Sequence, residues 1–130
     1  MPGRTIRVLS LLAFAVLLPG IASIGTAEAA DPTAGQAVFK SSCAICHTVQ
    51  AGRNTIGPTL FGVVGRKTGS VAGYTYSTAN QNANLTWTTE TLDKYLEAPN
   101  AVVPGTKMTY AGLKDAAKRA DLISYLETLK

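Results

Sequence analysis

The chain has 130 residues, with twelve Lys and Arg against eight Asp and Glu and a formal net charge of +4. This small positive excess does not indicate a nucleic-acid-binding protein. The two cysteines and one histidine are fewer than the four protein ligands of a structural zinc site, so the composition also argues against a zinc domain.

Residues 1–29 have the pattern of an export signal. A basic N-terminal region with Arg4 and Arg7 precedes an apolar run over residues 8–18. Residues 27–29 form an A-x-A cleavage motif. An uncleaved membrane anchor would need roughly 20 apolar residues, and this run reaches about half that length. We therefore expect a cleaved signal peptide and one mature domain over residues 30–130. The mature part keeps ten Lys and Arg against seven Asp and Glu, a charge of +3.

The first predicted element of the mature chain is a helix over residues 33–44. Asp31 can cap it, and Pro32 suits its first position because an N–H there would have no partner. Apolar residues follow at helical spacing. The segment CAICH, residues 43–47, therefore lies at or just beyond the end of this helix.

Residues 48–86 are rich in Gly, Thr, Ser and Asn and show neither strand alternation nor a long helical period. We predict loops there, with one short helix near residues 77–82. So long an irregular stretch is unusual in a compact domain, and the apolar residues of a chain of roughly 100 residues form a thin core. Both observations are explained if the loops wrap around an apolar ligand.

Two further helices are predicted in the C-terminal part. Thr88 can cap a helix over residues 89–97 that is ended by Pro99, and the last helix covers residues 115–129. The apolar stripe of the last helix consists of Leu122, Tyr125, Leu126 and Leu129. Since no strand pattern is present, we predict an all-α fold with three main helices, one short helix and long loops.

The segment CAICH allows four interpretations. A zinc site would need a second pair of ligands, and a thioredoxin-like dithiol would need a βαβ context that the sequence lacks. A disulfide between Cys43 and Cys46 would be catalytic rather than structural, and it leaves His47 unexplained. The fourth interpretation is C-x-x-C-H as the attachment motif of a covalent haem, and this is the one that we favour for an exported chain.

Under the haem interpretation, His47 binds the iron from one face, and the ligand on the other face decides between electron transfer and small-ligand binding. Met108 is the one methionine of the mature chain, and it follows Pro104 and Gly105 in a loop. A His/Met pair raises the reduction potential and suits an electron carrier. Lys107 is a rival ligand at high pH, and a single methionine is ordinarily core filler.

Several further motifs follow CxxCH in order along the chain: GRKTG, YTYS, PGTKM and DLISYL. With them, residues 33–130 resemble a class I c-type cytochrome of the mitochondrial cytochrome c and bacterial cytochrome c2 branch. The resemblance implies the cytochrome c fold, with helices and loops wrapped around one haem c per chain. It also implies that Cys43 and Cys46 hold this haem covalently.

The resemblance implies roles for individual residues as well. His47 and Met108 match the axial iron ligands, and Pro58 matches the residue whose carbonyl accepts a hydrogen bond from the histidine ring. The positions that match the residues around the haem propionates are Arg66, Tyr76 and Trp87, with Ser77 and Thr106 close by. A polar cluster behind the methionine is matched by Asn80, Tyr95 and Thr106. The packing of the first helix on the last is matched by Gly35, Phe39, Leu122 and Tyr125.

The family resemblance and the signal sequence together lead us to expect a soluble, monomeric electron carrier of the bacterial periplasm, and not an enzyme. It would take single electrons from a membrane quinol-oxidising cytochrome complex. Its acceptor would be a terminal oxidase, a photosynthetic reaction centre or a peroxidase, in transient complexes. The alternative is a haem protein with a labile sixth site, for small-ligand binding or peroxide chemistry. Ser42 and Asn100 stand where the family often has basic residues, so electrostatic steering should be weak.

Overall fold

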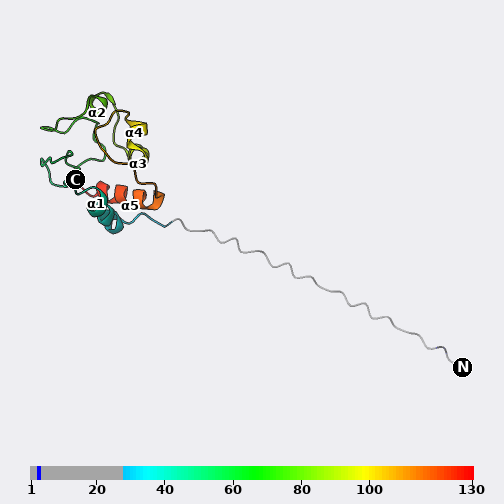
Figure 1. Ribbon diagram of the computed structural model, residues 1–130. Helices are drawn as coiled ribbons and strands as arrows, with labels where there is room; N and C mark the ends of the chain where they lie inside the picture. Colours follow the sequence, from blue (N-terminus) through cyan, green and yellow to red (C-terminus); the bar gives the residue numbers. More distant parts are fainter. Residues whose placement is uncertain (1–2, 4–27) are drawn as a thin grey trace.

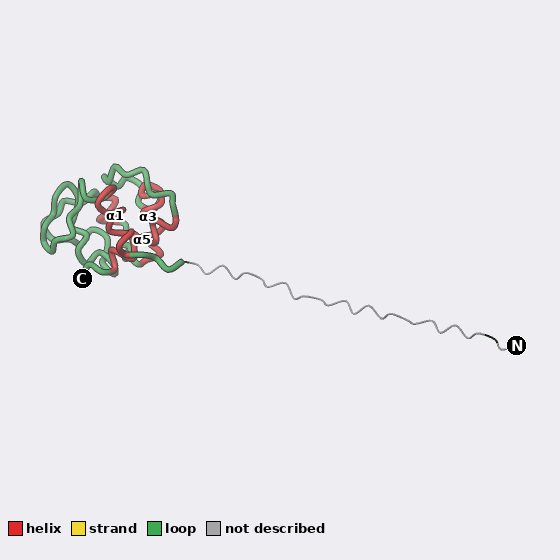
Figure 2. Tube along the Cα trace, turned by 90° about the horizontal axis from the view of Figure 1, so that it is seen from below, coloured by secondary structure: helices red, strands yellow, loops and turns green. Residues whose placement is uncertain are grey.

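The computed structural model describes Gly3 and residues 28–130, and the expected signal segment therefore lies outside the described residues. The described chain contains five helices, namely α1 (Pro32–Ser42), α2 (Thr78–Asn82), α3 (Thr89–Glu97), α4 (Pro99–Val102) and α5 (Ala116–Glu127). Helices α1 and α5 lie against each other, with α3 beside them, while the loops extend mostly to one side of this group (Figures 1 and 2). Within the described residues no helix has the length and apolar character needed to cross a bilayer.

Helix α1 begins and packs as its sequence predicts. The Asp31 carboxylate accepts a hydrogen bond from the Thr33 N–H at 2.8 Å, and Pro32 occupies the first turn. A Cβ atom on Gly35 would lie 1.9 Å from the Asp121 carbonyl oxygen of α5, so only glycine permits this close approach. One turn later, the Phe39 ring packs on Tyr125 with centroids 5.8 Å apart.

Of the C-terminal helices, α3 has the predicted cap and bounds, whereas α5 is shorter than the predicted range 115–129. Thr88 caps α3 through the Thr91 N–H, and α5 begins one residue after its cap Asp115 and ends at Glu127. The prediction of a loop from Pro99 onward is wrong, because residues Pro99–Val102 form the short helix α4. Proline is accepted in the first turn of a helix, so it can both end one helix and begin the next.

The region between α1 and α3 is irregular, as predicted. The short helix α2 is capped by Ser77, whose hydroxyl accepts from the Asn80 N–H. The described residues contain no strand, and one isolated antiparallel bridge joins Lys67 to Thr86. The buried hydrophobic core consists of Phe39, Val63, Trp87, Leu92, Tyr95, Val103, Leu122, Ile123, Tyr125 and Leu126.

Candidate functional site

The CAICH segment forms a tight turn at the end of α1. Cys43 is the C-cap residue, and its N–H donates to the Phe39 carbonyl at 2.8 Å. The N–H groups of Cys46 and His47 both donate to the Cys43 carbonyl, at 3.0 and 2.9 Å. No disulfide joins the two cysteines, and both are half-buried.

The His47 ring has a fixed orientation and tautomer. Its Nδ1 lies 2.7 Å from the carbonyl oxygen of Pro58. Because a carbonyl can only accept, Nδ1 carries the proton and Nε2 keeps a free lone pair. Burial lowers the pKa of His47, the hydrogen bond to Pro58 opposes this shift, and the Arg66 charge adds to it. The imidazole is therefore neutral near pH 7 and able to bind a metal ion through Nε2.

Met108 lies in the loop between α4 and α5 and is half-buried. The Tyr95 hydroxyl donates to its sulfur at 4.0 Å and lies 3.3 Å from the Thr106 hydroxyl. The Met108 N–H donates to the same Thr106 hydroxyl at 3.3 Å. Tyr95 and Thr106 thus form two members of the polar cluster that the family resemblance implies behind the methionine. Asn80, the third predicted member, makes no hydrogen bond to this cluster through its side chain.

His47 and Met108 line one cavity of about 410 Å³. Ten of the eleven predicted site residues line it, namely Cys43, Cys46, His47, Pro58, Arg66, Tyr76, Asn80, Trp87, Tyr95 and Met108. Thr106 is not among the lining residues, although it contacts both Tyr95 and Met108. Ser77 is likewise outside the lining. The sequence analysis did not assign the apolar part of the wall, which includes Leu60, Val63, Leu92, Leu96 and Leu126.

Two buried polar atoms in this cavity lack partners in the described protein, Arg66 Nε and Asn80 Oδ1. Arg66 donates from its other two nitrogens to the Phe61 and Thr59 carbonyls, both at 3.0 Å. No carboxylate of the described chain pairs with it, and burial lowers its pKa. A buried cation with a free donor is stabilised by an anion. The cavity therefore fits a largely apolar group that carries carboxylates, as haem does.

Three loop segments around the cavity are tied together by side chains. The Tyr74 hydroxyl donates to the Ile56 carbonyl at 2.9 Å, and the Asn54 amide donates to the Ala72 carbonyl at 3.0 Å. Lys107 Nζ donates to the Thr75 carbonyl and lies 4.5 Å from the Tyr74 ring centroid. The segment before Pro58 and the segment carrying Met108 are therefore both joined to the loop that contains Tyr74.

Comparison with known proteins identifies the family of this chain. The family model Cytochrome c matches residues 32–130. Cytochrome c2 of Rhodopila globiformis is 52% identical over 106 residues, covering 82% of this chain and 100% of that protein. Cytochrome c of Ginkgo biloba is 49% identical over 107 residues, covering 82% of this chain and 95% of that protein.

The solved structure of cytochrome cH from Methylobacterium extorquens is also similar. It is 42% identical to this chain, with a TM-score of 0.72 and coverage of 75% of this chain and 98% of that chain. The cavity, the motif and these similarities lead to one conclusion. The chain belongs to the cytochrome c family of haem-containing electron carriers, and it binds haem c covalently through Cys43 and Cys46.

Proposed function

We propose that this protein carries single electrons in the bacterial periplasm, with His47 and Met108 as the two axial ligands of its haem iron. Haem c supplies the one-electron redox couple. The observation that carries the proposal is that the His47 ring and the Met108 thioether, the two side chains suited to this ligation, line the same cavity. The protein holds each of them through its own hydrogen bonds.

The protein itself orients the His47 ring for ligation. The hydrogen bond from Nδ1 to Pro58 fixes the plane of the ring and leaves Nε2 free. A carbonyl acceptor on the second nitrogen also makes an imidazole a stronger donor. Because the ring is fixed, it does not need to reorient when the charge of the iron changes.

Met108 is held by its backbone and from its side. Thr106 accepts from the Met108 N–H, and Tyr95 donates to the sulfur. A thioether is a soft ligand that favours the reduced iron, and the Tyr95 hydroxyl withdraws electron density from the sulfur. A ligand held in this way changes position little between the two redox states, which suits rapid electron transfer.

The location and partners follow from the signal pattern and the family. Residues 1–29 direct the chain to the periplasm in this proposal, and intact-mass measurement on the exported protein tests it. A mass that begins near Ala30 supports soluble release, whereas a mass that includes the first 29 residues contradicts it. The donor is a membrane quinol-oxidising cytochrome complex, and the acceptor is a terminal oxidase, a reaction centre or a peroxidase. The protein meets both as a monomer, in transient complexes.

The partners dock at the mouth of the cavity in this proposal. The large hydrophobic side chains exposed in the described chain are Ile45, at 82%, and Ile56, at 71%, and both line this cavity. Among the described residues, the cavity lining contains one lysine, Lys107, and no carboxylate. The Lys107 Nζ donates a hydrogen bond to the Thr75 carbonyl. Apolar contact therefore contributes more to docking here than charge attraction does.

An optical spectrum of the oxidised, haem-loaded protein tests the ligation. We expect a low-spin c-type spectrum with a weak near-infrared band from iron–methionine coordination, and we expect Met108→Leu to lack this band. A high-spin spectrum of the wild-type protein contradicts the proposal. That result favours the alternative function, a haem protein with a labile sixth site for small ligands or peroxide.

A further inference from the structure

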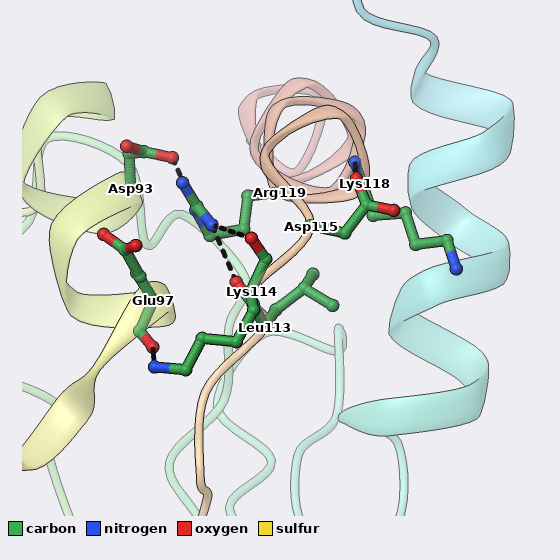
Figure 3. A network of polar contacts seen from close by, with 7 residues as sticks. All are labelled: Asp93, Glu97, Leu113, Lys114, Asp115, Lys118 and Arg119. Atoms are coloured by element: carbon green, nitrogen blue, oxygen red, sulfur yellow. Dashed lines mark hydrogen bonds and ion pairs between the residues drawn. The ribbon is translucent and has the colours of Figure 1, made fainter.

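Arg119 is a buried cation outside the cavity. It lies in the first turn of α5 with 5% of its surface exposed. Its Nε donates to the Asp93 carboxylate of α3 at 2.8 Å, and its Nη1 donates to the Leu113 and Lys114 carbonyls at 2.8 and 3.1 Å (Figure 3). A guanidinium is buried at reasonable cost only when it has such partners. Arg119 therefore joins α3, α5 and the segment between them.

The two carbonyls that Arg119 holds belong to the end of the Met108 loop, which we define as residues 103–115. This end of the loop also lies directly against the end of α3. The Leu113 N–H donates to the Leu96 carbonyl at 2.7 Å, and Lys114 Nζ donates to the Glu97 carbonyl. Gly112 has a φ of +100°, and a Cβ atom there would lie 2.0 Å from the Glu97 carbonyl oxygen.

Between Met108 and Leu113 the backbone of the loop has little hydrogen bonding of its own. Within the described chain, the backbone N–H groups of residues 109–112 make no hydrogen bond to another backbone group. On the other side of Met108, the loop is fixed by the Thr106 N–H, which donates to the Val103 carbonyl at 3.0 Å. The Met108 loop is therefore held by hydrogen bonds at both of its ends, to Val103 at one end and to Leu96 and Arg119 at the other.

We propose that Arg119 is a positioning residue for Met108. By holding the Leu113 and Lys114 carbonyls against α3, it fixes the end of the Met108 loop and keeps the thioether in the cavity. This inference rests on the proposed His47/Met108 ligation. The contacts of Arg119 do not contribute equally to this positioning. The Asp93 side chain is 46% exposed, so its bond is weakened by solvent, and the two carbonyl bonds do the positioning.

The test compares three haem-loaded variants, Arg119→Lys, Asp93→Asn and Phe39→Leu. Lysine keeps the positive charge but not the planar fork of donors that reaches two carbonyls and a carboxylate together. We expect Arg119→Lys to raise the rate of carbon monoxide binding to the reduced protein at least about tenfold, because the loss of one hydrogen bond to a charged group shifts the opening equilibrium of the loop by about this factor or more. Its near-infrared iron–methionine band should also disappear at a lower pH than in the wild-type protein.

The two control variants separate positioning from general stability. Asp93→Asn keeps an acceptor for Nε and leaves the carbonyl bonds intact, so its carbon monoxide rate should stay within about twofold of the wild-type rate. Phe39→Leu weakens the α1–α5 contact without touching the Met108 loop. If Phe39→Leu raises the rate as much as Arg119→Lys at the same loss of thermal stability, the proposal is overturned. It is also overturned if Arg119→Lys binds carbon monoxide at the wild-type rate.

A measurement on the wild-type protein decides the matter if Arg119→Lys does not accumulate. In increasing denaturant, loss of the iron–methionine band and hydrogen exchange of the Leu113 amide should report the same opening reaction. Continued protection of Leu113 while the band is lost overturns the positioning role. Met108→Leu shows whether the ligation itself is wrong. If Met108 is not the iron ligand, the near-infrared band and the carbon monoxide rate of Met108→Leu are the same as those of the wild-type protein.

Discussion

Gly57 lies so close to the His47 ring that a Cβ atom on it would come within 2.4 Å of the His47 Cε1 atom. The His47 ring is held in this position by its hydrogen bond to the carbonyl of Pro58, the residue that follows Gly57. The backbone of Gly57 therefore forms one wall of the histidine site. Gly57 is not among the residues with positive φ, so its lack of a side chain is required for space and not for backbone conformation.

We predict that Gly57→Ala displaces the His47 ring. Overpacking at a buried site costs about 1–3 kcal/mol of unfolding free energy, and here the displaced group is the proposed ligand. The variant should lose thermal stability and show altered haem absorption. Gly52→Ala is the matched control, because Gly52 has a φ of +70° and a Cβ atom added there would meet no atom within 4 Å. It should lose about 1 kcal/mol through backbone strain with an unchanged spectrum, and equal spectra of the two variants would contradict the role of Gly57.

We predict that Met108→Ala and Met108→Leu both lower the reduction potential, because both remove the soft sulfur ligand. They should differ in stability. Leucine keeps most of the buried volume and should cost less than about 1.5 kcal/mol, whereas alanine leaves a gap and should cost about 2 kcal/mol or more. Potentiometric titration and thermal unfolding measure the two effects. An unchanged potential in both variants would show that Met108 is not the ligand.

We predict that the double variant Cys43→Ala with Cys46→Ala is largely unfolded when no haem is attached. The cavity has a volume of about 410 Å³. At about 24 cal/mol per Å³, leaving such a cavity empty costs at most about 10 kcal/mol, which is comparable to the whole stability of a typical domain. Far-UV circular dichroism checks this expectation. A native-like helical spectrum of the double variant would mean that the thin core is sufficient without haem.

We predict that electron transfer to partners depends more on Ile45 and Ile56 than on salt. With native membranes as the donor, the second-order rate of reduction should fall less than about tenfold between low and physiological ionic strength, since little charge attraction is involved. Ile45→Ser with Ile56→Ser should slow the reaction at every ionic strength. Lys118→Ala, which removes an exposed charge outside the cavity lining, serves as the control. A steep salt dependence with no effect of the isoleucine variants would place docking elsewhere.

The sequence was informative wherever the structure depends on local signals. The caps Asp31 and Thr88, which the sequence predicts, set the starts of α1 and α3. Ser77 and Asp115, which the sequence analysis did not assign as caps, do the same for α2 and α5. The family resemblance brought the site residues together by motif, although they come from distant parts of the chain. The resemblance therefore predicted the candidate site more fully than the residue pattern alone did.

The features that sequence reasoning missed depend on long-range partners. The burial of Arg119 follows from Asp93, which lies 26 positions away, and from two loop carbonyls. The bond from Tyr74 to the Ile56 carbonyl joins two loops in the same way. Side-chain to backbone bonds of this kind have no periodicity. Helix α4 was missed for a different reason, because Pro99 is as compatible with a helix start as with a helix end.

The most direct test of the proposed His47/Met108 carrier is the addition of carbon monoxide to the reduced, haem-loaded protein at neutral pH. Met108 should occupy the sixth position of the iron, so we predict slow or negligible binding. The same measurement on Met108→Ala should show rapid, stoichiometric binding, which verifies that the assay detects an open site. Rapid and stoichiometric binding by the wild-type protein would contradict the carrier function and assign the protein to the class with a labile sixth site.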